Sequence, residues 1–514
     1  MSRSAGPVVL AVDCSTTGAK AVAFDAAGRT VAEARVPYHR TSPRPGWQEQ
    51  DPADWWGATA GALAGAVRAL GPDHRPAALA VTHQRETFVC LDADDRPLRP
   101  GVLWLDTRAG EQIARLGSAR VHELSGKPPS TAPSLYKLAW LAEHEPRVLR
   151  RTALVLDVHG YLVRLLTGTR STSWASADPL SLLDMQHLRW SPELVAAAGL
   201  AVDQLPALVA PGAPLGGLGA AAARRTGLPE GLPVVAGAGD GQCAGLGSGA
   251  LVPGRAYLNL GTALTLGVHS PGYRWAAAYR TLASPLAGAY VLEALLPSGA
   301  LSIGWFRDAL SGLTGERREE RLERLAADVP AGARGLLFLP YLSSAETPHW
   351  DPHARGAFVG LAEEHGRAEM YRAVLEGLAY EERANLHLLE QDTGTAVEEV
   401  VVTGGAARSP LFTQILADVL QRRVLVAREP ETTALGAGVL AAAAVGLTGS
   451  SDLRDVVAAM TGTGAVLEPD PRPRAVYEEA AGLHAQLYPR LRPLFPGLSR
   501  LRGGTAGDGT GPAA

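Results

Sequence analysis

The chain opens with an apolar run that stops at a carboxylate. Val8–Val12 reads as a strand, Asp13–Lys20 as a polar turn that contains a glycine, and Ala21–Phe24 as a second strand. A third strand is predicted from Thr30 to Val36, after the next turn. The pattern therefore predicts a β-hairpin, followed by a third strand, at the start of the fold.

A segment near the middle of the chain repeats this design. Ala256–Leu260 and Ala263–Val268 read as strands on either side of the small turn Gly261-Thr262. The repetition predicts two domains, each opening with a β-hairpin. We expect the first over 7–252 and the second over 253–450, then a helical extension over 451–502 and a disordered tail over 503–514.

Strand-like and helix-like runs alternate through the rest of the chain. The further predicted strands are Ala77–Val81, Thr87–Leu91, Ala153–Leu156, Pro233–Gly237, Gly335–Leu339 and Glu399–Val402. The predicted helices are Trp55–Leu70, Ser134–His144, Gly160–Leu166, Arg367–Leu389, Leu411–Leu420 and Ala434–Ala444. Such alternation is typical of α/β layers.

Composition excludes several classes of protein. The 514 residues are 46% hydrophobic and 19% charged, which is globular and rules out disorder as the main state. The 48 basic and 52 acidic side chains give a net charge of −4, so no nucleic-acid partner is expected. Three widely spaced cysteines predict neither a disulfide framework nor a zinc site, and fit a reducing cytoplasm. No apolar run reaches the roughly 20 residues that span a bilayer, so a soluble cytoplasmic protein is expected.

The first turn has the chemistry of a phosphate site. Hydroxyls and backbone N–H groups of Ser15–Gly18 can surround phosphate oxygens, and the Asp13 carboxylate could hold Mg²⁺ through its waters. An ordinary hairpin with an Asx turn would look similar. The chain carries no GxxxxGK[ST] motif, so the Walker A type of phosphate loop is excluded.

Two further segments place small residues where a strand ends. Asp240 follows an apolar strand and lies between Gly239 and Gly241, a position that suits a general base with room for a ligand. A helix N-cap is the alternative for this carboxylate. Thr403–Ala406 lies between a strand and a helix, where a nucleotide can approach the backbone closely.

The motifs taken in order resemble the FGGY family of carbohydrate kinases. The matching segments are Asp13–Lys20, Gly46–Pro52, Trp104–Arg108, Ser134–His144, Gly239-Asp240, Gly261-Thr262, Gly356–Glu376 and Thr403–Ala406. Leu339–Ser343, followed by Thr347-Pro348 and Asp351-Pro352, resembles xylulokinases in particular. The resemblance implies two actin-like, ribonuclease-H-like domains of the sugar kinase/Hsp70 type around a central cleft. The first is then the carbohydrate-binding domain and the second the nucleotide-binding domain.

The family resemblance also implies roles for individual residues. Asp240 matches the catalytic base, and Asp13 matches the position that binds Mg²⁺ through water. The positions implied for ATP and its phosphates are Thr16, Thr17, Lys20, Gly261, Thr262, Gly404, Gly405, Ala406 and Ser409. Those implied for the substrate are Arg85, Glu86, Trp104, Asp106 and Asp240.

The substrate stays open between two groups of the family. His83–Thr87 resembles the segment in which glycerol kinases bind polyol hydroxyls through Arg and Glu, whereas the second half of the chain leans toward pentulose kinases. Gly241 replaces the polar residue that usually follows the base in both groups. An Arg85–Glu86 pair with a purely structural role is the alternative.

We therefore expect an ATP-dependent kinase of a sugar or polyol, with D-xylulose or a similar pentulose ahead of glycerol or a tetritol. A non-catalytic, nucleotide-gated sugar-binding protein is the alternative from another class. The resemblance allows a homodimer, since dimers are common among such kinases.

Overall fold

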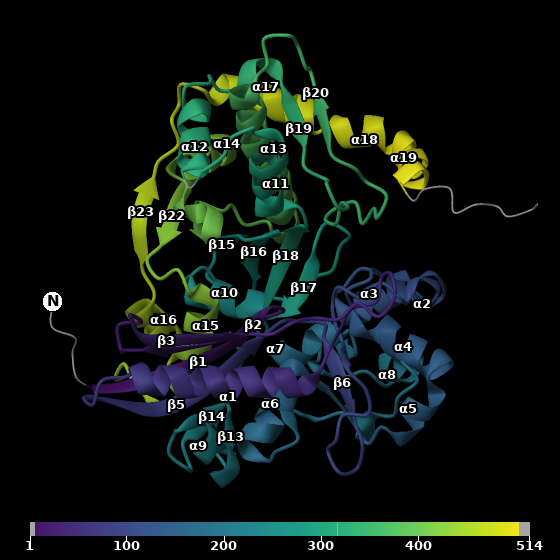
Figure 1. Cartoon of the computed structure of the whole chain (residues 1–514), viewed down its shortest axis with the longest axis vertical. Coiled ribbons are helices and arrows are strands. Elements are labelled where there is room, and N and C mark those ends of the chain that lie inside the picture. The colour runs from purple at the N-terminus through teal and green to yellow at the C-terminus, as the bar shows by residue number, and fades with distance from the viewer. Residues whose placement is uncertain (1–5, 316, 503–514) are drawn as a thin grey trace, which may run out of the picture. The chain divides into compact units, whose positions relative to one another are not determined.

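The computed structural model describes residues 6–315 and 317–502, which form two compact units. Unit 1 comprises Met1–Tyr257, Gly267–Glu293 and Ala427–Ala465, and unit 2 comprises Leu258–Leu266, Ala294–Val426 and Val466–Ala514. Strands and helices alternate in both, so the predicted α/β class is confirmed (Figure 1). The predicted disordered tail, 503–514, lies outside the described residues.

Unit 1 is built on a six-stranded mixed sheet. Its order is β13 (Pro214–Gly217), β14 (Pro233–Val235), β5 (His74–His83), β1 (Gly6–Cys14), β2 (Gly18–Phe24), β3 (Thr30–Pro37). β1 pairs antiparallel with β2 and parallel with β5. The first predicted hairpin and the strand after it are therefore confirmed.

Alternating apolar residues attach helix α1 (Pro52–Ala69) to this sheet. Val8, Leu10 and Val12 of β1 lie in one core with Trp55 and Leu63 of α1, because successive strand side chains point to opposite faces. The helix begins earlier than its apolar pattern suggests. Asp51 caps it by accepting a bond from the Ala53 N–H at 2.9 Å, and Pro52 occupies the first turn.

The rest of unit 1 contains further, shorter strands. A four-stranded sheet has the order β4 (Glu49–Gln50), β7 (Gly101–Val102), β6 (Phe88–Leu91), β8 (Leu154–Asp157). Short pairs join β9 (Ser171–Ser173) to β12 (Ala207–Val209), β10 (Leu183–Asp184) to β11 (Arg189–Trp190), and β17 (Arg280–Ala283) to β18 (Tyr290–Leu296).

The remaining helices of unit 1 come from several stretches of the chain. They are α2 (Gly110–Leu116), α3 (Ala119–Ser125), α4 (Ser134–His144), α5 (Pro146–Arg151), α6 (Val158–Thr167), α7 (Trp174–Ala177), α8 (Pro192–Ala197), α9 (Ala220–Thr226), α10 (Asp240–Gly247), α15 (Thr432–Val445), α16 (Leu453–Met460) and the 3₁₀ turns η1 (Asp178–Leu180) and η2 (Val202–Gln204). α15 packs on β1 and β5, so a late segment of the chain completes the unit that the first residues begin.

Unit 2 contains a second sheet and the longest helix. Residues of β18, β16 (Leu264–Ser270), β15 (Arg255–Leu260), β21 (Glu399–Thr403), β22 (Arg423–Ala427) and β23 (Thr463–Leu467) follow one another in this sheet, and β19 (Leu337–Leu339) pairs with β20 (Ala357–Val359). Its helices are α11 (Gly299–Trp305), η3 (Phe306–Leu310), α12 (Arg318–Ala327), η4 (Ala333–Gly335), α13 (Arg367–Thr393), η5 (Gly405–Arg408), α14 (Pro410–Leu420), α17 (Arg474–His484), α18 (Leu487–Leu491), η6 (Arg492–Leu494) and α19 (Phe495–Arg502).

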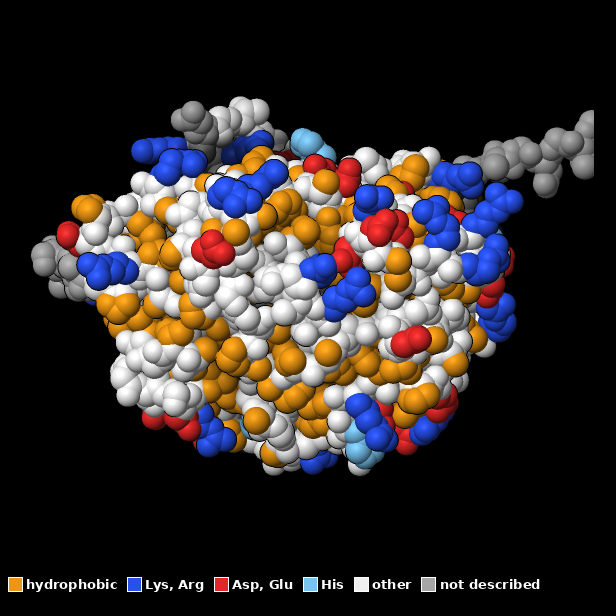
Figure 2. All heavy atoms as spheres, turned by 90° about the horizontal axis from the view of Figure 1, so that it is seen from below, with side chains coloured by type: hydrophobic (Ala, Val, Ile, Leu, Met, Phe, Trp, Pro, Cys, Tyr) orange, Lys and Arg blue, Asp and Glu red, His pale blue; other side chains and the backbone are white. Residues whose placement is uncertain are grey.

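Two surface properties bear on the class of partner. Among the described helices, none combines the length and the apolar character that crossing a membrane requires. On the face drawn in Figure 2, basic and acidic side chains are interspersed rather than gathered into a field of one sign. This face therefore lacks the continuous basic surface by which nucleic-acid-binding proteins are recognised.

Candidate active site

The first predicted phosphate turn joins β1 to β2. Asp13 lies near the end of β1, opposite Lys20 of β2 and Thr82 of β5. Burial and the negative charges of Asp240 and Glu431 raise the pKa of Asp13 to about 7. Its Oδ1 is buried with no hydrogen-bond partner among the described residues.

Neighbouring side chains fix the shape of this turn. The Trp104 indole N–H donates to Thr16 Oγ1 at 3.0 Å, and the Gln50 amide donates to the Thr16 carbonyl at 2.7 Å. Thr17 is exposed, and its hydroxyl accepts from Arg35 Nη2 at 3.3 Å. The turn thus presents an exposed hydroxyl on a braced backbone.

The Lys20 ammonium already forms ion pairs with two carboxylates. Its Nζ lies 3.0 Å from Glu33 Oε2 and 2.8 Å from Glu431 Oε1. A phosphate that recruited this ammonium would have to compete with both partners.

Asp240 is the first residue of α10, and Gly239 holds the N-cap position. Its Oδ1 accepts from the Gly241 N–H at 2.7 Å and contacts Arg85 Nε at 2.6 Å. Both contacts use the same oxygen and the side chain is 44% exposed, so Oδ2 is open to a ligand. The alternative of a helix N-cap is therefore not what the structure has.

Arg85 and Glu86 follow β5 and are both buried. Glu86 has φ of +58°, an unusual backbone for a residue with a side chain. The Lys137 ammonium, from α4, donates to the carbonyls of Glu86 at 3.3 Å, Leu103 at 3.0 Å and Ala132 at 2.6 Å. Lys137 therefore ties this strained turn to the segments that contain Leu103 and Ala132.

Three residues that the sequence analysis did not single out complete the cluster. Glu293 of β18 accepts from Arg85 Nη1 at 3.1 and 3.2 Å, from Arg280 Nε at 2.6 Å and from the Tyr257 hydroxyl at 3.0 Å. Although its burial acts in the opposite direction, Arg280 and Arg85 lower the pKa of Glu293 to about 2. The available signal was a glutamate in the apolar run Tyr290–Leu296, where an ionised side chain needs a partner.

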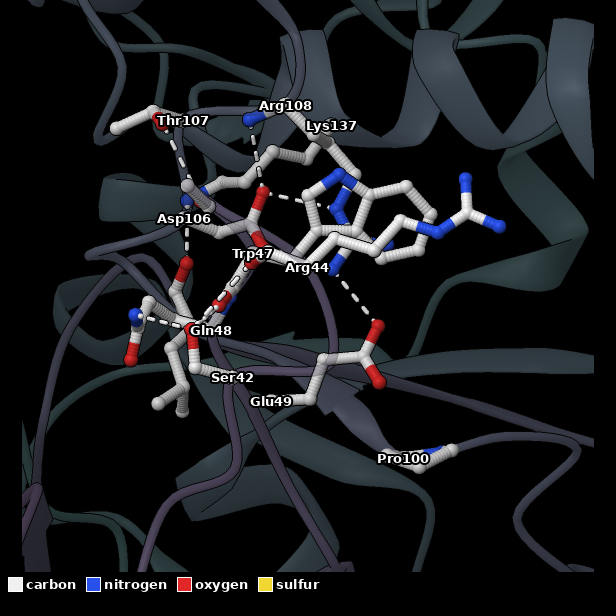
Figure 3. Close-up of polar contacts among 12 residues, drawn as sticks. Ser42, Arg44, Trp47, Gln48, Glu49, Pro100, Asp106, Thr107, Arg108 and Lys137 are labelled. Atoms are coloured by element: carbon white, nitrogen blue, oxygen red, sulfur yellow. Dashed lines mark hydrogen bonds and ion pairs between the residues drawn. The ribbon is translucent and has the colours of Figure 1, made fainter. Parts of the chain in front are cut away.

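Asp106 is occupied by contacts within the protein (Figure 3). Its Oδ1 accepts from Arg108 Nε at 2.8 Å, and its Oδ2 accepts from Arg108 Nη2 at 2.7 Å and from the Gln48 N–H at 2.6 Å. The Trp47 ring lies between the guanidinium groups of Arg108 and Arg44, whose Cζ atoms are 3.8 and 4.8 Å from the ring centroid. Asp106 is fully buried, so this geometry makes it a brace of the motif around Trp47.

In unit 2, the second predicted phosphate turn lies next to the glycine loop after β21. The Thr403 hydroxyl donates to Asn259 Oδ1 at 3.5 Å. Gly404 has φ of +86°, and a Cβ there would lie 2.6 Å from the same oxygen, so only glycine fits. Gly405 has open space where a side chain would begin.

The remaining unit 2 candidates differ in what they offer a ligand. The carbonyls of Gly261 and Thr262 accept from the N–H groups of Ala300 and Leu301 at 3.0 and 3.2 Å, which ties the turn to the start of α11. Gly405 and Ala406 form the first half of η5. Ser409 caps α14 and donates to Glu323 Oε1 at 2.6 Å, so its hydroxyl is already engaged.

Comparison with known proteins gives a consistent set of relatives. Profiles of the N-terminal and C-terminal domains of the FGGY family of carbohydrate kinases match residues 8–247 and 256–445. The chain is 34% identical over 459 residues to a glycerol kinase of Alkalilimnicola ehrlichii, covering 86% of this chain and 91% of the relative. It is 33% identical over 422 residues to a xylulose kinase of Escherichia coli, covering 80% and 84%. The crystal structure of a xylulose kinase from Rhodospirillum rubrum superposes with a TM-score of 0.87 at 33% identity, covering 95% of this chain and 99% of that one.

Proposed function

Because the chain belongs to the FGGY family of carbohydrate kinases, we propose that it transfers the γ-phosphoryl group of ATP to a carbohydrate hydroxyl. A pentulose such as D-xylulose is the leading substrate in this proposal. Support comes from the xylulose kinases among the relatives, both in sequence and in fold.

The observation that supports this reaction is an accessible carboxylate in contact with a buried ionic cluster. Asp240 keeps one oxygen on Arg85 and the Gly241 N–H, and leaves the other for a substrate hydroxyl. In the proposed step the hydroxyl oxygen bonds to the γ-phosphorus, the bond from that phosphorus to the ADP oxygen breaks, and Asp240 accepts the hydroxyl proton. Asp240 is therefore the proposed general base.

Substrate recognition is assigned to the side chains around this base. Arg85 donates from a planar fork and Glu86 accepts, a combination that suits vicinal hydroxyls. The Trp104 ring can pack on the C–H face of a sugar while its N–H holds Thr16. Asp106 acts in this proposal through Arg108 and the backbone of Gln48, not by contact.

The nucleotide residues fall into two groups. Thr16, Thr17 and the Lys20 region of unit 1 are proposed to meet phosphates, as is the turn Gly261-Thr262 of unit 2. Gly404, Gly405 and Ala406 are proposed to lie along the nucleotide, with Ser409 holding the start of α14 behind them.

The residues around Asp13 fit a magnesium ion. Its buried Oδ1 lacks a partner, and a hard carboxylate oxygen is a preferred ligand or water acceptor for Mg²⁺. Glu431 adds a second negative charge near Asp13, which also favours a cation there. When bound, Mg²⁺ would neutralise charge on the phosphates of ATP.

Glycerol or a tetritol is the second candidate substrate. The Arg85-Glu86 pair favours it, because this pair is what the chain has in common with the polyol-binding segment of glycerol kinases. A glycerol kinase is also among the relatives, at an identity similar to that of the xylulose kinase.

An ADP-release assay over ketopentoses, aldoses, polyols and glycerol tests the proposal. We expect the highest kcat/KM for a ketopentose, with Mg²⁺ required. A highest value for glycerol or a tetritol would replace the leading substrate with the second candidate. If none of these compounds causes ADP to be released, the proposed function is overturned and a binding protein is favoured.

A further inference from the structure

Two residues of a buried hairpin contact the proposed substrate residues. β17 and β18 pair antiparallel, and their register sets Arg280 directly opposite Glu293. Both are buried: Glu293 is 0% and Arg280 6% exposed. Two ionised side chains are buried here, where each needs a partner.

Glu293 joins two guanidinium groups and a hydroxyl. Arg280 Nε lies 2.6 Å from its Oε1, Arg85 Nη1 lies 3.1 Å from the same oxygen, and the Tyr257 hydroxyl lies 3.0 Å from Oε2. Glu293 therefore holds Arg85 at Nη1, whereas Asp240 holds it at Nε.

Arg280 in turn reaches the second substrate residue. Its Nη1 lies 2.8 Å from Glu86 Oε1. Arg85 and Glu86 therefore each contact a hairpin residue directly, Glu293 and Arg280 respectively. Asp240 is connected to the hairpin through Arg85.

The glycines beside the base leave space for this cluster. A Cβ at Gly241 would lie 2.5 Å from Glu293 Oε2 and 2.8 Å from Arg85 Nη1. A Cβ at Gly239 would lie 2.7 Å from the Arg85 side chain. A side chain at position 241 and the Arg85–Glu293 pair would thus compete for one volume, which accounts for glycine after the base in this chain.

We propose that Glu293 and Arg280 are positioning residues, which hold Arg85 and Glu86 in the geometry that binds the carbohydrate hydroxyls. This inference rests on the proposed function and adds to it two residues and the reason for Gly241. Held donors and acceptors bind more tightly because less orientation is lost on binding.

A similar buried arrangement of Arg, Glu and Tyr in unit 2 supplies a control. Arg372 Nε lies 2.7 Å from Glu376 Oε1, and the Tyr477 hydroxyl lies 2.7 Å from Arg372 Nη2 and 3.2 Å from Glu376 Oε1. Tyr257 and Tyr477 are equally buried, and each is 1% exposed. None of these three contacts involves a proposed substrate residue.

The test compares Michaelis constants for the best substrate of the screen and for ATP. Glu293→Gln should raise the carbohydrate KM at least about tenfold, because the ion pairs with both guanidinium groups lose their charge. Tyr257→Phe should raise it about three- to tenfold, because Glu293 loses one of its hydrogen bonds and keeps both guanidinium partners. The KM for ATP should stay within about twofold of wild type in both. Tyr477→Phe should change neither constant, although it removes the same hydroxyl from the same kind of pair.

Folding and function are separated by the design. Tyr257→Phe removes one oxygen only, so it keeps the test open if Glu293→Gln does not fold. An active wild type with an unchanged carbohydrate KM in Tyr257→Phe overturns the positioning role alone. Equal rises in Tyr257→Phe and Tyr477→Phe overturn it as well, since the effect would then be one of general stability. A wild type that phosphorylates nothing overturns the proposed function and this inference together.

Discussion

At the scale of single residues, the proposed reaction depends on one proton acceptor. Asp240, Glu86 and Glu293 each have a guanidinium partner, but Glu86 and Glu293 are buried. Asp240 alone of these three is both ionisable and substantially exposed, at 44%. The difference in surroundings separates a base from residues that orient.

Asp240→Asn tests this role. The amide keeps the shape and still accepts a hydrogen bond, but it cannot take the hydroxyl proton. We expect kcat to fall by about 10²- to 10⁴-fold. Carbohydrate binding, measured by calorimetry, should stay within about tenfold of wild type because Arg85 and Glu86 remain. Retention of more than about a tenth of the wild-type kcat would remove Asp240 as the base.

At the scale of elements, the sequence predicted well what local pattern determines. α4 has the predicted bounds Ser134–His144, and β15 and β21 lie within a residue of prediction at each end. Helix starts were less accurate, as at α1, where the cap and Pro52 lie outside the apolar pattern. Motifs located Asp13, Asp240 and the glycine loops because those signals are contiguous in the chain.

The hairpin β17–β18 and the residues it carries could not be predicted in this way. Arg85 and Glu293 are 208 positions apart, and nothing in the spacing of either segment specifies the other. Arg280 and Glu293 are adjacent only because the strands pair in one register. A side-chain cluster assembled from distant strands depends on tertiary structure, whereas a turn motif depends on local sequence.

The glycine loop after β21 gives a prediction with its control in the next residue. Gly404→Ala should strain a backbone at φ of +86° and push a Cβ against Asn259 Oδ1, costing about 1–3 kcal/mol. Gly405→Ala meets open space and should cost far less. Thermal unfolding and titration with ATP measure stability and nucleotide affinity. We expect both to fall in Gly404→Ala; equal affinities in the two variants would show that the loop does not approach the nucleotide.

Helix α13 carries a buried carboxyl that should make stability depend on pH. Burial raises the pKa of Glu381 to about 7, opposed by the hydrogen bond from the Tyr341 hydroxyl at 2.9 Å. The unfolded chain releases this proton near the ordinary value of 4.5, whereas the folded protein keeps it to about pH 7. Wild-type stability should therefore fall as pH rises through this range, because the unfolded state binds fewer protons.

Glu381→Gln removes this titration. From pH 4.5 to 7 the variant should gain on the order of 3 kcal/mol relative to wild type, measured from denaturant midpoints. Glu320→Gln, at an exposed position of α12, controls for the loss of a carboxylate and should not reproduce the gain. Parallel pH profiles for wild type and Glu381→Gln would show that this carboxyl is ionised in the folded protein.

At the scale of the whole molecule, the proposed binding residues are divided between the units. Arg85, Glu86 and Asp240 belong to unit 1, whereas Gly261, Thr262 and the loop from Gly404 belong to unit 2. A carbohydrate bound by the first group stabilises the unit that holds it. Any ligand that binds only the folded state has this effect, and its size depends on concentration relative to Kd.

Carbohydrate alone, without nucleotide, should thus raise the melting temperature of unit 1. At about 100 times Kd the stabilisation is about 2.7 kcal/mol, which corresponds to roughly 4 °C for a unit of this size. Asp240→Asn should keep most of the shift, because the hydroxyl-binding residues remain. Arg85→Ala should lose it, since the fork that meets the hydroxyls is gone and a charge-assisted hydrogen bond contributes about 1.5–3 kcal/mol. Differential scanning calorimetry of the three proteins, with and without the best substrate of the screen, makes the comparison. An equal shift in Arg85→Ala and wild type would place the carbohydrate elsewhere and leave Arg85 a structural partner of Glu293.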